Sequence, residues 1–282
     1  MKNPLPAQVN SETPHAAPLG SVVGDLRLHE FASRIFRNTR MLRVWLPPGY
    51  DDAQQQDRHY PVLYLNDGQN LFDAATSFIG VEWQADETAD RLIRAGVIAP
   101  MIIVGIDNAR KDRIREYLPF RSFNPPILRP QGRHYPDFLT KEVMPFICRQ
   151  YRIAAGPENT GLGGSSLGAI ATLYTVMARP GVFGHLLLES PSLWMSNRAL
   201  LRQGREIARW PQRVFLAVGT REMGREDKDR QTVDDVRDLA QVLRRAGLDE
   251  TRLRLLIDEG APHSETSWAR RFPEALTFLF SQ

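Results

Sequence analysis

The sequence predicts an α/β fold in which helices cover both faces of a mostly parallel central sheet of about eight strands. Short apolar runs alternate with helical patterns from about residue 22 onward, which is typical of such a sheet. Some runs are apolar throughout, including Pro61–Leu65 and Met101–Ile106, as strands buried on both faces should be. With 282 residues, of which 42% are hydrophobic, the chain can bury one large core.

The expected strands lie in a regular order along the chain. The first two are separated by Arg37-Asn38 and are expected to form an antiparallel pair, whereas the later ones alternate with helices. The segments are Leu26–Phe31, Met41–Leu46, Pro61–Leu65, Met101–Ile106, Thr160–Gly163, Leu186–Leu188, Val214–Val218 and Leu253–Ile257.

The expected helices are marked by apolar residues at helical spacing and by residues that start or end helices. Pro145 is expected to kink one helix, and Pro180 to end another. Thr232 is expected to cap a later helix that stops just before Gly247. The segments are Glu82–Ala95, Phe138–Tyr151, Ser166–Ala178, the stretch from Thr232 to Gly247, and a final helix lined by Trp268, Phe272, Leu276 and Leu279.

Composition excludes several classes of protein. The 36 basic and 33 acidic residues leave a net charge of only +3, with no basic block, which argues against nucleic-acid binding. The single cysteine, Cys148, excludes an intramolecular disulfide and a cysteine-based metal site, and is expected to be a small core residue. No apolar run approaches the length of a membrane span, so no membrane association is expected.

Residues 1–20 are expected to form a flexible N-terminal arm ahead of a single catalytic domain, residues 21–282. The arm contains four prolines among small and polar residues. It has no apolar segment like that of a secretion signal, so the sequence as given favours a cytoplasmic location.

The candidate nucleophile is Ser166. Gly164-Ser165-Ser166-Leu167-Gly168 matches the pattern G-x-S-x-G between an expected strand and an expected helix. The chain must reverse sharply there, so the positions around the serine must be small. Only Ser166 has glycine two residues before and two residues after it, and the start of the helix favours the negative charge that develops during attack.

The candidate base is His263, and the candidate acid is Glu222. In this type of site the order along the chain is serine, acid, histidine, and only His185 and His263 follow Ser166. His185 precedes a strand and is expected to be structural or exposed, whereas His263 follows the last strand. Glu222 is the carboxylate nearest the end of the preceding strand, and its role is to orient His263 and stabilise the imidazolium form. Asp227, Asp229 and Glu189 remain alternatives for the acid.

The oxyanion hole requires two backbone N–H groups. Leu167, directly after the nucleophile, should supply one. Gln69, in the loop after the Pro61–Leu65 strand, should supply the other, because Gly68 can adopt an unusual conformation that directs the next amide toward the site.

Five sequence blocks together resemble the family named "Putative esterase", which includes esterase D, enterochelin esterases, carbohydrate esterases of family 1 and mycobacterial mycolyltransferases. The resemblance covers about residues 22–279. The blocks are Tyr60–Phe72, Gly163–Gly168, Ser190-Pro191-Ser192-Leu193-Trp194, Gly219-Thr220-Arg221-Glu222, and His263-Ser264-Glu265 with Trp268.

The resemblance implies an α/β-hydrolase fold, a Ser166–His263–Glu222 triad, and an oxyanion hole built from Gln69 and Leu167. Many relatives carry aspartate where this chain has Glu222. Asp67, Asn70 and Trp194 are expected to contact substrate, and the segment Tyr117–Tyr135 is expected either to act as a partial lid or to pack on the surface.

The sequence therefore predicts a serine esterase that acts on a small-molecule ester, without metal or organic cofactor. Siderophore, carbohydrate and aryl esters all remain open as substrates. Two alternatives are an acyltransferase that uses a sugar or lipid alcohol, and a non-catalytic binding protein on a hydrolase scaffold. The oligomeric state is not predicted.

Overall fold

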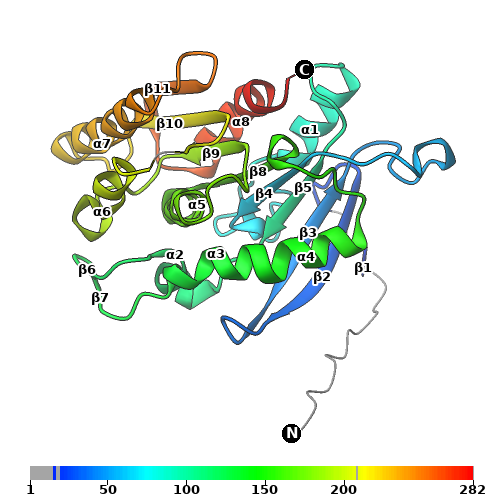
Figure 1. Cartoon of the computed structure of the whole chain (residues 1–282), viewed down its shortest axis with the longest axis horizontal. Coiled ribbons are helices and arrows are strands. Elements are labelled where there is room, and N and C mark those ends of the chain that lie inside the picture. Colours follow the sequence, from blue (N-terminus) through cyan, green and yellow to red (C-terminus); the bar gives the residue numbers. More distant parts are fainter. Residues whose placement is uncertain (1–14, 17–19, 208, 282) are drawn as a thin grey trace, which may run out of the picture.

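A computed structural model describes residues 15–16, 20–207 and 209–281. Its main feature is a nine-stranded sheet with the order β1-β2-β3-β5-β4-β8-β9-β10-β11 (Figure 1). The strands are β1 (His15–Ala16), β2 (Asp25–Ser33), β3 (Asn38–Leu46), β4 (Val62–Asn66), β5 (Ile102–Ile106), β8 (Thr160–Ser165), β9 (His185–Glu189), β10 (Arg213–Arg221) and β11 (Leu253–Pro262). A separate two-stranded hairpin consists of β6 (Ser122–Phe123) and β7 (Pro126–Ile127).

The sheet is antiparallel at one end and parallel over the rest. β2 and β3 pair antiparallel from Asp25↔Leu46 to Ser33↔Asn38, and β3 is also antiparallel to β5. From β5 to β11 all neighbouring strands are parallel. Every residue of β4, β5, β8 and β9 is buried, which explains why these strands are apolar or glycine-rich rather than alternating.

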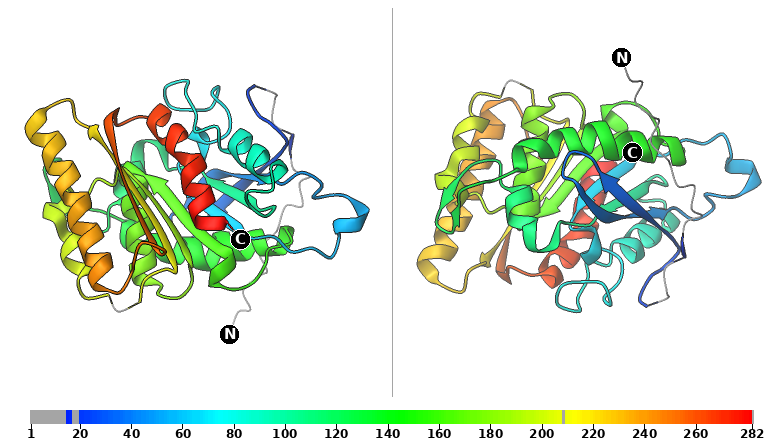
Figure 2. Two further views of the ribbon diagram at one scale, coloured as in Figure 1. Left: turned by 90° about the horizontal axis from the view of Figure 1, so that it is seen from above. Right: turned by 90° about the horizontal axis from the view of Figure 1, so that it is seen from below.

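Helices cover both faces of the sheet, and each face has its own apolar core (Figures 1 and 2). One core involves α1 (Ala85–Arg94) and α8 (Glu265–Phe280), which pack against each other. The other involves α2, α3, α4, α5, α6 and α7, which span Arg113–Tyr117, Tyr135–Asp137, Met144–Gln150, Ser166–Ala178, Met195–Gly204 and Glu226–Arg245. This arrangement confirms the α/β-hydrolase fold class.

The carboxyl ends of the parallel strands meet at one edge of the sheet, where sites form in open α/β folds. β4 ends before Asp67, β8 ends before Ser166, β10 ends before Glu222, and β11 ends before His263. The sheet therefore brings together segments that are distant in the sequence.

The predicted elements differ from the structure mainly at helix boundaries. The helix expected to be capped by Thr232 begins earlier, at Glu226, so the predicted cap is wrong. Acidic residues fill its first turn and favour that start through the helix dipole, while Thr232 lies inside and bonds Lys228 O. The predicted end is confirmed, because Gly247 follows the helix with φ +90°.

The helix expected over Phe138–Tyr151 is not α-helical throughout. A π-helical segment, Phe138–Val143, leads into α4, which carries Pro145 in its first turn. Because proline lacks a backbone N–H group, the helical hydrogen-bonding pattern widens from the α-helical to the π-helical spacing before it. Cys148, expected in the core, is exposed.

The expected N-terminal arm falls mostly outside the described residues. Of residues 1–20, only His15–Ala16 and Gly20 are described, and His15–Ala16 pair with β2. Among the described helices, none combines the length and the apolar character needed to cross a lipid bilayer.

Candidate active site

Ser166 occupies a tight turn between β8 and α5. It is the first residue of the helix and has φ +55°, a left-handed conformation that L-residues rarely adopt. A Cβ atom at Gly164 would lie 2.9 Å from the carbonyl carbon of Gly168, and one at Gly168 would lie 2.8 Å from an Asp67 oxygen. The two glycines are therefore required for the close approach that exposes Ser166.

Ser166 and His263 both line two adjoining cavities. The larger has a volume of about 1230 Å³ and is bordered by the loops after β4 and β5. The smaller has a volume of about 190 Å³ and is lined by Leu167, Pro125 and Trp194, among others. Ser166 and His263 thus stand where the two cavities meet.

His263 is held by Glu222, as the sequence predicts for a base and its acid. His263 Nδ1 is hydrogen-bonded to Glu222 Oε2. The second oxygen, Oε1, accepts hydrogen bonds from Ser190 Oγ at 2.7 Å and from the Gly219 N–H at 2.6 Å. The ring of Trp268 packs edge-on against His263 with the centroids 5.0 Å apart.

Glu222 is an anion despite its burial. Its side chain is 0% exposed, and burial by itself would raise its pKa. Hydrogen bonds from His263, Ser190 and Gly219 outweigh that effect and hold the pKa of Glu222 below its ordinary value. A carboxylate in this state can stabilise the imidazolium form of His263.

Ser166 itself is hydrogen-bonded to a second serine. Its Oγ lies 3.3 Å from Ser192 Oγ, and among the described residues no hydrogen bond joins it to His263. The structure therefore brings the hydroxyl and the imidazole to one cleft without the direct contact that proton transfer requires.

The alternative acids have other partners. Asp227 pairs with Arg225 at the exposed start of α7, and Asp229 accepts the N–H of Met223 at 2.6 Å. Glu189 forms a fully buried ion pair with Arg271, at 2.7 Å. Glu222 is thus the favoured carboxylate. His185, whose Nε2 bonds Glu158 O at 2.8 Å and whose ring stacks on Phe280, is structural as predicted.

The candidate oxyanion donors lie at two helix starts. Leu167 is in the first turn of α5, where N–H groups have no intrahelical acceptor, and Gln69 is in a short 3₁₀ helix, Gly68–Asn70. The expectation about Gly68 is corrected: the left-handed residue is Asp67, with φ +60°. Gly68 is needed instead because a Cβ there would lie 2.5 Å from the carbonyl carbon of Gly105.

Asp67 and Asn70 border the larger cavity but are engaged within the protein. Asp67 accepts two hydrogen bonds from Arg113, at 2.7 and 2.8 Å, and another from Asn108 at 2.6 Å. Asn70 donates to Glu265 at 3.3 Å and accepts the N–H of Phe78 at 3.0 Å. Substrate contact by these residues and by Trp194 stays a prediction.

Three participants were not predicted from the sequence. Ser190 and Ser192 follow β9 in the block Ser190-Pro191-Ser192, whose position after a strand is the feature that could have indicated them. Arg113 gave no comparable indication, since its partner Asp67 is 46 residues away in the chain. The segment Tyr117–Tyr135, expected as lid or surface packing, contains the β6–β7 hairpin and supplies Pro125 to the smaller cavity.

Known proteins resemble this chain over nearly its whole length. YbbA of Bacillus subtilis, an uncharacterized protein, is 25% identical over 270 residues, which cover 92% of this chain and 97% of YbbA. The ferri-bacillibactin esterase BesA of the same organism is 26% identical over 205 residues, covering 65% of this chain and 66% of BesA. The crystal structure of the BES protein from Bacillus cereus matches with a TM-score of 0.72 at 17% identity, covering 96% of this chain and all of that one.

A family model described as "Putative esterase" matches residues 33–279, which include the turn at Ser166, Glu222 and His263. The chain therefore belongs to this esterase family and is a carboxylic ester hydrolase with an α/β-hydrolase fold.

Proposed function

We propose that the enzyme cleaves esters through an acyl-enzyme on Ser166, with His263 as general base and Glu222 as its acid. The observation that carries this proposal is the connected set at the cleft: Glu222 bonds His263 Nδ1, and His263 shares both cavities with a serine at φ +55°.

In the first half of the reaction, His263 Nε2 takes the proton of Ser166 Oγ while that oxygen bonds to the acyl carbon. The resulting oxyanion accepts hydrogen bonds from the amides of Leu167 and Gln69. The C–O bond to the alcohol breaks, and the imidazolium returns its proton to the departing alkoxide. In the second half, water replaces the alcohol and its proton follows the same route, so the acid is released and Ser166 is restored.

The first step requires a small rearrangement. Ser166 Oγ, which bonds Ser192 Oγ at 3.3 Å, must turn toward His263. A side-chain rotation of this kind takes picoseconds to nanoseconds and does not limit turnover. Ser192 then remains next to the reacting oxygen and helps to order it between cycles.

We further propose a bulky, anionic ester as substrate; the relative BesA is named as a ferri-bacillibactin esterase. The larger cavity holds about 1230 Å³, more than a short-chain ester fills. Arg110 and Lys111 stand exposed on its border, where they attract negative charge. The competing substrates are neutral aryl esters and sugar acetates.

The test combines labelling with hydrolysis. A fluorophosphonate probe should label the wild type and Ser165→Ala, which keeps the neighbouring turn, but not Ser166→Ala. Hydrolysis should fall by at least about 10⁴-fold in Ser166→Ala. A folded wild type that is not labelled would contradict the mechanism and favour a binding protein.

Substrate class is tested on the same preparations. A panel of ferric and metal-free siderophore lactones, feruloyl esters, sugar acetates and nitrophenyl esters should show the highest kcat/KM for the anionic lactones. Preference for a neutral ester, or faster transfer to added alcohols than to water, would overturn the substrate proposal.

A further inference from the structure

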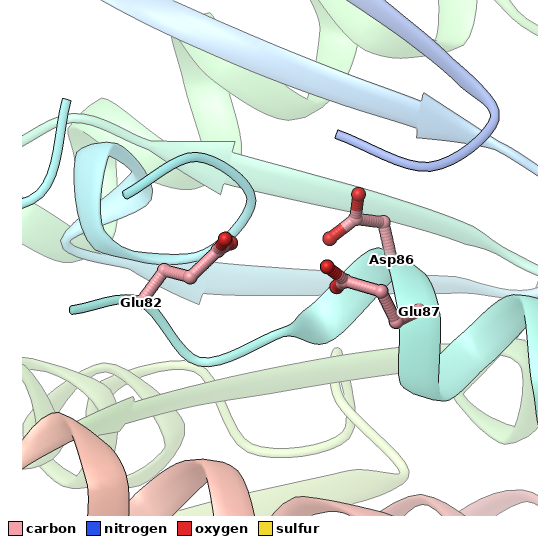
Figure 3. Close-up of side chains that lie close together, drawn as sticks. All are labelled: Glu82, Asp86 and Glu87. Carbon is pink, nitrogen blue, oxygen red and sulfur yellow. The ribbon is translucent and has the colours of Figure 1, made fainter. Parts of the chain in front are cut away.

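Three acidic side chains face one another on the far side of the loop that borders the cleft. Figure 3 shows Glu82, just before α1, opposite Asp86 and Glu87 in the first turn of that helix. One carboxylate oxygen from each lies within 4.8 Å of the others. Asp86 is 0% exposed and Glu82 is 5% exposed, so this is not an ordinary solvated surface.

Each of the three carboxyl groups has an oxygen whose hydrogen-bonding needs are unmet. Within the described part of the chain, no hydrogen bond reaches Glu82 Oε2, Asp86 Oδ1 or Glu87 Oε2, although all three atoms are buried. Buried polar atoms almost always have a hydrogen-bonding partner. Three carboxylate oxygens in one cluster without such a partner therefore indicate a bound, positively charged group that attracts all three.

The other oxygens of Glu82 and Asp86 accept hydrogen bonds from the segment before β2. Ser21 Oγ bonds Glu82 Oε1, and the Val23 N–H donates to Asp86 Oδ2 at 2.6 Å. Ser21 Oγ also accepts the Ala74 N–H at 3.2 Å. Glu82 and Asp86 are thereby fixed in place, each with one oxygen that has no hydrogen-bonding partner among the described residues.

Charge in the cluster is one-sided. No arginine or lysine among the described residues forms an ion pair with Glu82, Asp86 or Glu87. The arrangement is thus costly unless a cation or shared protons offset it.

We propose that Glu82, Asp86 and Glu87 bind a calcium ion. Calcium takes six to eight oxygen ligands at about 2.3–2.6 Å, so oxygens on opposite sides of one ion are about 5 Å apart. One oxygen from each of the three carboxyl groups lies within 4.8 Å of the others, so all three can reach one ion. All the donors are oxygens, which suits calcium rather than zinc or copper. Water completes the coordination at the half-buried side of Glu87.

The ion would join three parts of the fold: the Ser21–Val23 segment, the loop that ends at Glu82, and α1. The same loop carries Phe78 and Ile79, which border the larger cavity. Calcium therefore stabilises the wall of the cleft from outside, without contacting the reacting groups.

The test measures binding and stability, and neither readout needs the esterase reaction, so its outcome is separate from that of the proposed function. The full chain is treated with a chelator and titrated with calcium chloride in a calorimeter, and its thermal midpoint is followed in parallel. At calcium concentrations about 100-fold above Kd, the Tm of the wild type should rise by about 5–10 °C. Magnesium chloride should give a smaller rise.

Two variants and one control locate the site. Asp86→Asn and Glu87→Gln should lose most of the calcium-dependent rise, and Glu87→Gln changes only a half-buried residue, so folding is retained. Asp90→Asn removes a carboxylate of the same helix that pairs with Arg94 instead, and should respond like the wild type.

Three results would overturn the proposal. The first is a wild type that binds no calcium and whose Tm is unchanged in 10 mM calcium chloride, about tenfold above the Kd of the weakest calcium modules. The carboxyl groups would then share protons instead. The second is an undiminished calcium response in both cluster variants, which would place the ion elsewhere. The third is a stronger response to magnesium, which would contradict the choice of calcium.

Discussion

Ser190 Oγ donates its only proton to Glu222 Oε1, across 2.7 Å. Ser190 Oγ itself accepts hydrogen bonds from Trp268 Nε1 at 3.0 Å and from Arg271 Nη2 at 3.2 Å. An indole N–H and a guanidinium can only donate, so the hydroxyl must direct its hydrogen at the carboxylate. Ser190 therefore fixes the orientation of the acid that in turn holds His263.

Removing this hydroxyl should weaken catalysis without unfolding the protein. In Ser190→Ala, Glu222 Oε1 keeps only the hydrogen bond from the Gly219 N–H. The position of the carboxylate, and with it that of His263, is then less well defined. We expect kcat to fall about 10-fold with KM nearly unchanged, corresponding to the loss of one hydrogen bond to a charged group. Ser190→Cys keeps a weak donor without the branched Cβ that the left-handed backbone at this position (φ +44°) disfavours, and should recover part of the rate; if it does not, packing rather than the hydrogen bond is responsible.

The stability of the same variant should depend on pH. The folded-state pKa of Glu222 is lowered, so its contribution is present above the unfolded value of about 4.3 and is lost as the pH falls through the folded value. Ser190→Ala reduces this contribution by about 1 kcal/mol at pH 7. Urea unfolding of wild type and variant should converge when the pH is lowered toward the acid range, and a constant difference would contradict the assignment.

Arg271 and Glu189 form an ion pair beneath the triad, with side chains 2% and 0% exposed. Burial raises the pKa of Glu189 to about 7, although Arg271 opposes the shift. Because the folded pKa is raised, ionising Glu189 costs stability as the pH rises from about 4.3 through 7. Arg271→Met should thus cost about 3–5 kcal/mol at pH 8 and clearly less at pH 5.5.

The neighbouring arginine provides a matched control. Arg270 makes an exposed ion pair with Asp258, so Arg270→Met should change the free energy of unfolding by less than about 1 kcal/mol at either pH. Denaturant curves at the two pH values measure both variants. Equal losses for Arg271→Met at pH 5.5 and pH 8 would show that the charge of Glu189 is not the cause.

Gly68 should be sensitive to a single added methyl group. In Gly68→Ala the new Cβ would meet Gly105 C at 2.5 Å and Ile106 N at 2.7 Å, both backbone atoms that cannot move aside cheaply. The loop must shift and the amide of Gln69 with it, so we expect kcat to fall about 10²-fold. Gly204→Ala, where the nearest atom is 3.7 Å away, should leave kcat unchanged and serves as control.

The sequence predicted most of the sheet because buried parallel strands are apolar at every position. β4 and β5 match the runs from which they were predicted to within one residue at each end. The turn at Ser166 could be predicted equally well from the sequence, because the close approach of strand and helix requires its glycines. α6 was not predicted, because Met195–Gly204 lacks a clear apolar stripe and includes left-handed residues at Ser196, Asn197 and Arg198.

Most hydrogen-bonding networks between polar side chains could not be predicted from the sequence. The contacts of Ser190 with Glu222, Trp268 and Arg271 span between 32 and 81 residues of chain. Hydrogen bonds of this kind depend on the tertiary arrangement, which no local pattern encodes. The same holds for Glu82 and Asp86, which are close in the sequence but accept hydrogen bonds from the distant Ser21 and Val23, respectively.

His263 follows the last strand of the sheet, and β11 pairs with only one neighbour, β10, in the order described. That neighbour also carries Glu222 at its end, so a sideways shift of this strand pair would carry ring and carboxylate together, whereas Ser166 stays anchored in the middle of the sheet. In the proposed mechanism, the imidazole serves two oxygens in turn, first the attacking one and then the departing one. Because His263 lies at the border of the sheet and is held by its own counter-ion, Glu222, the ring has the freedom to reach both oxygens.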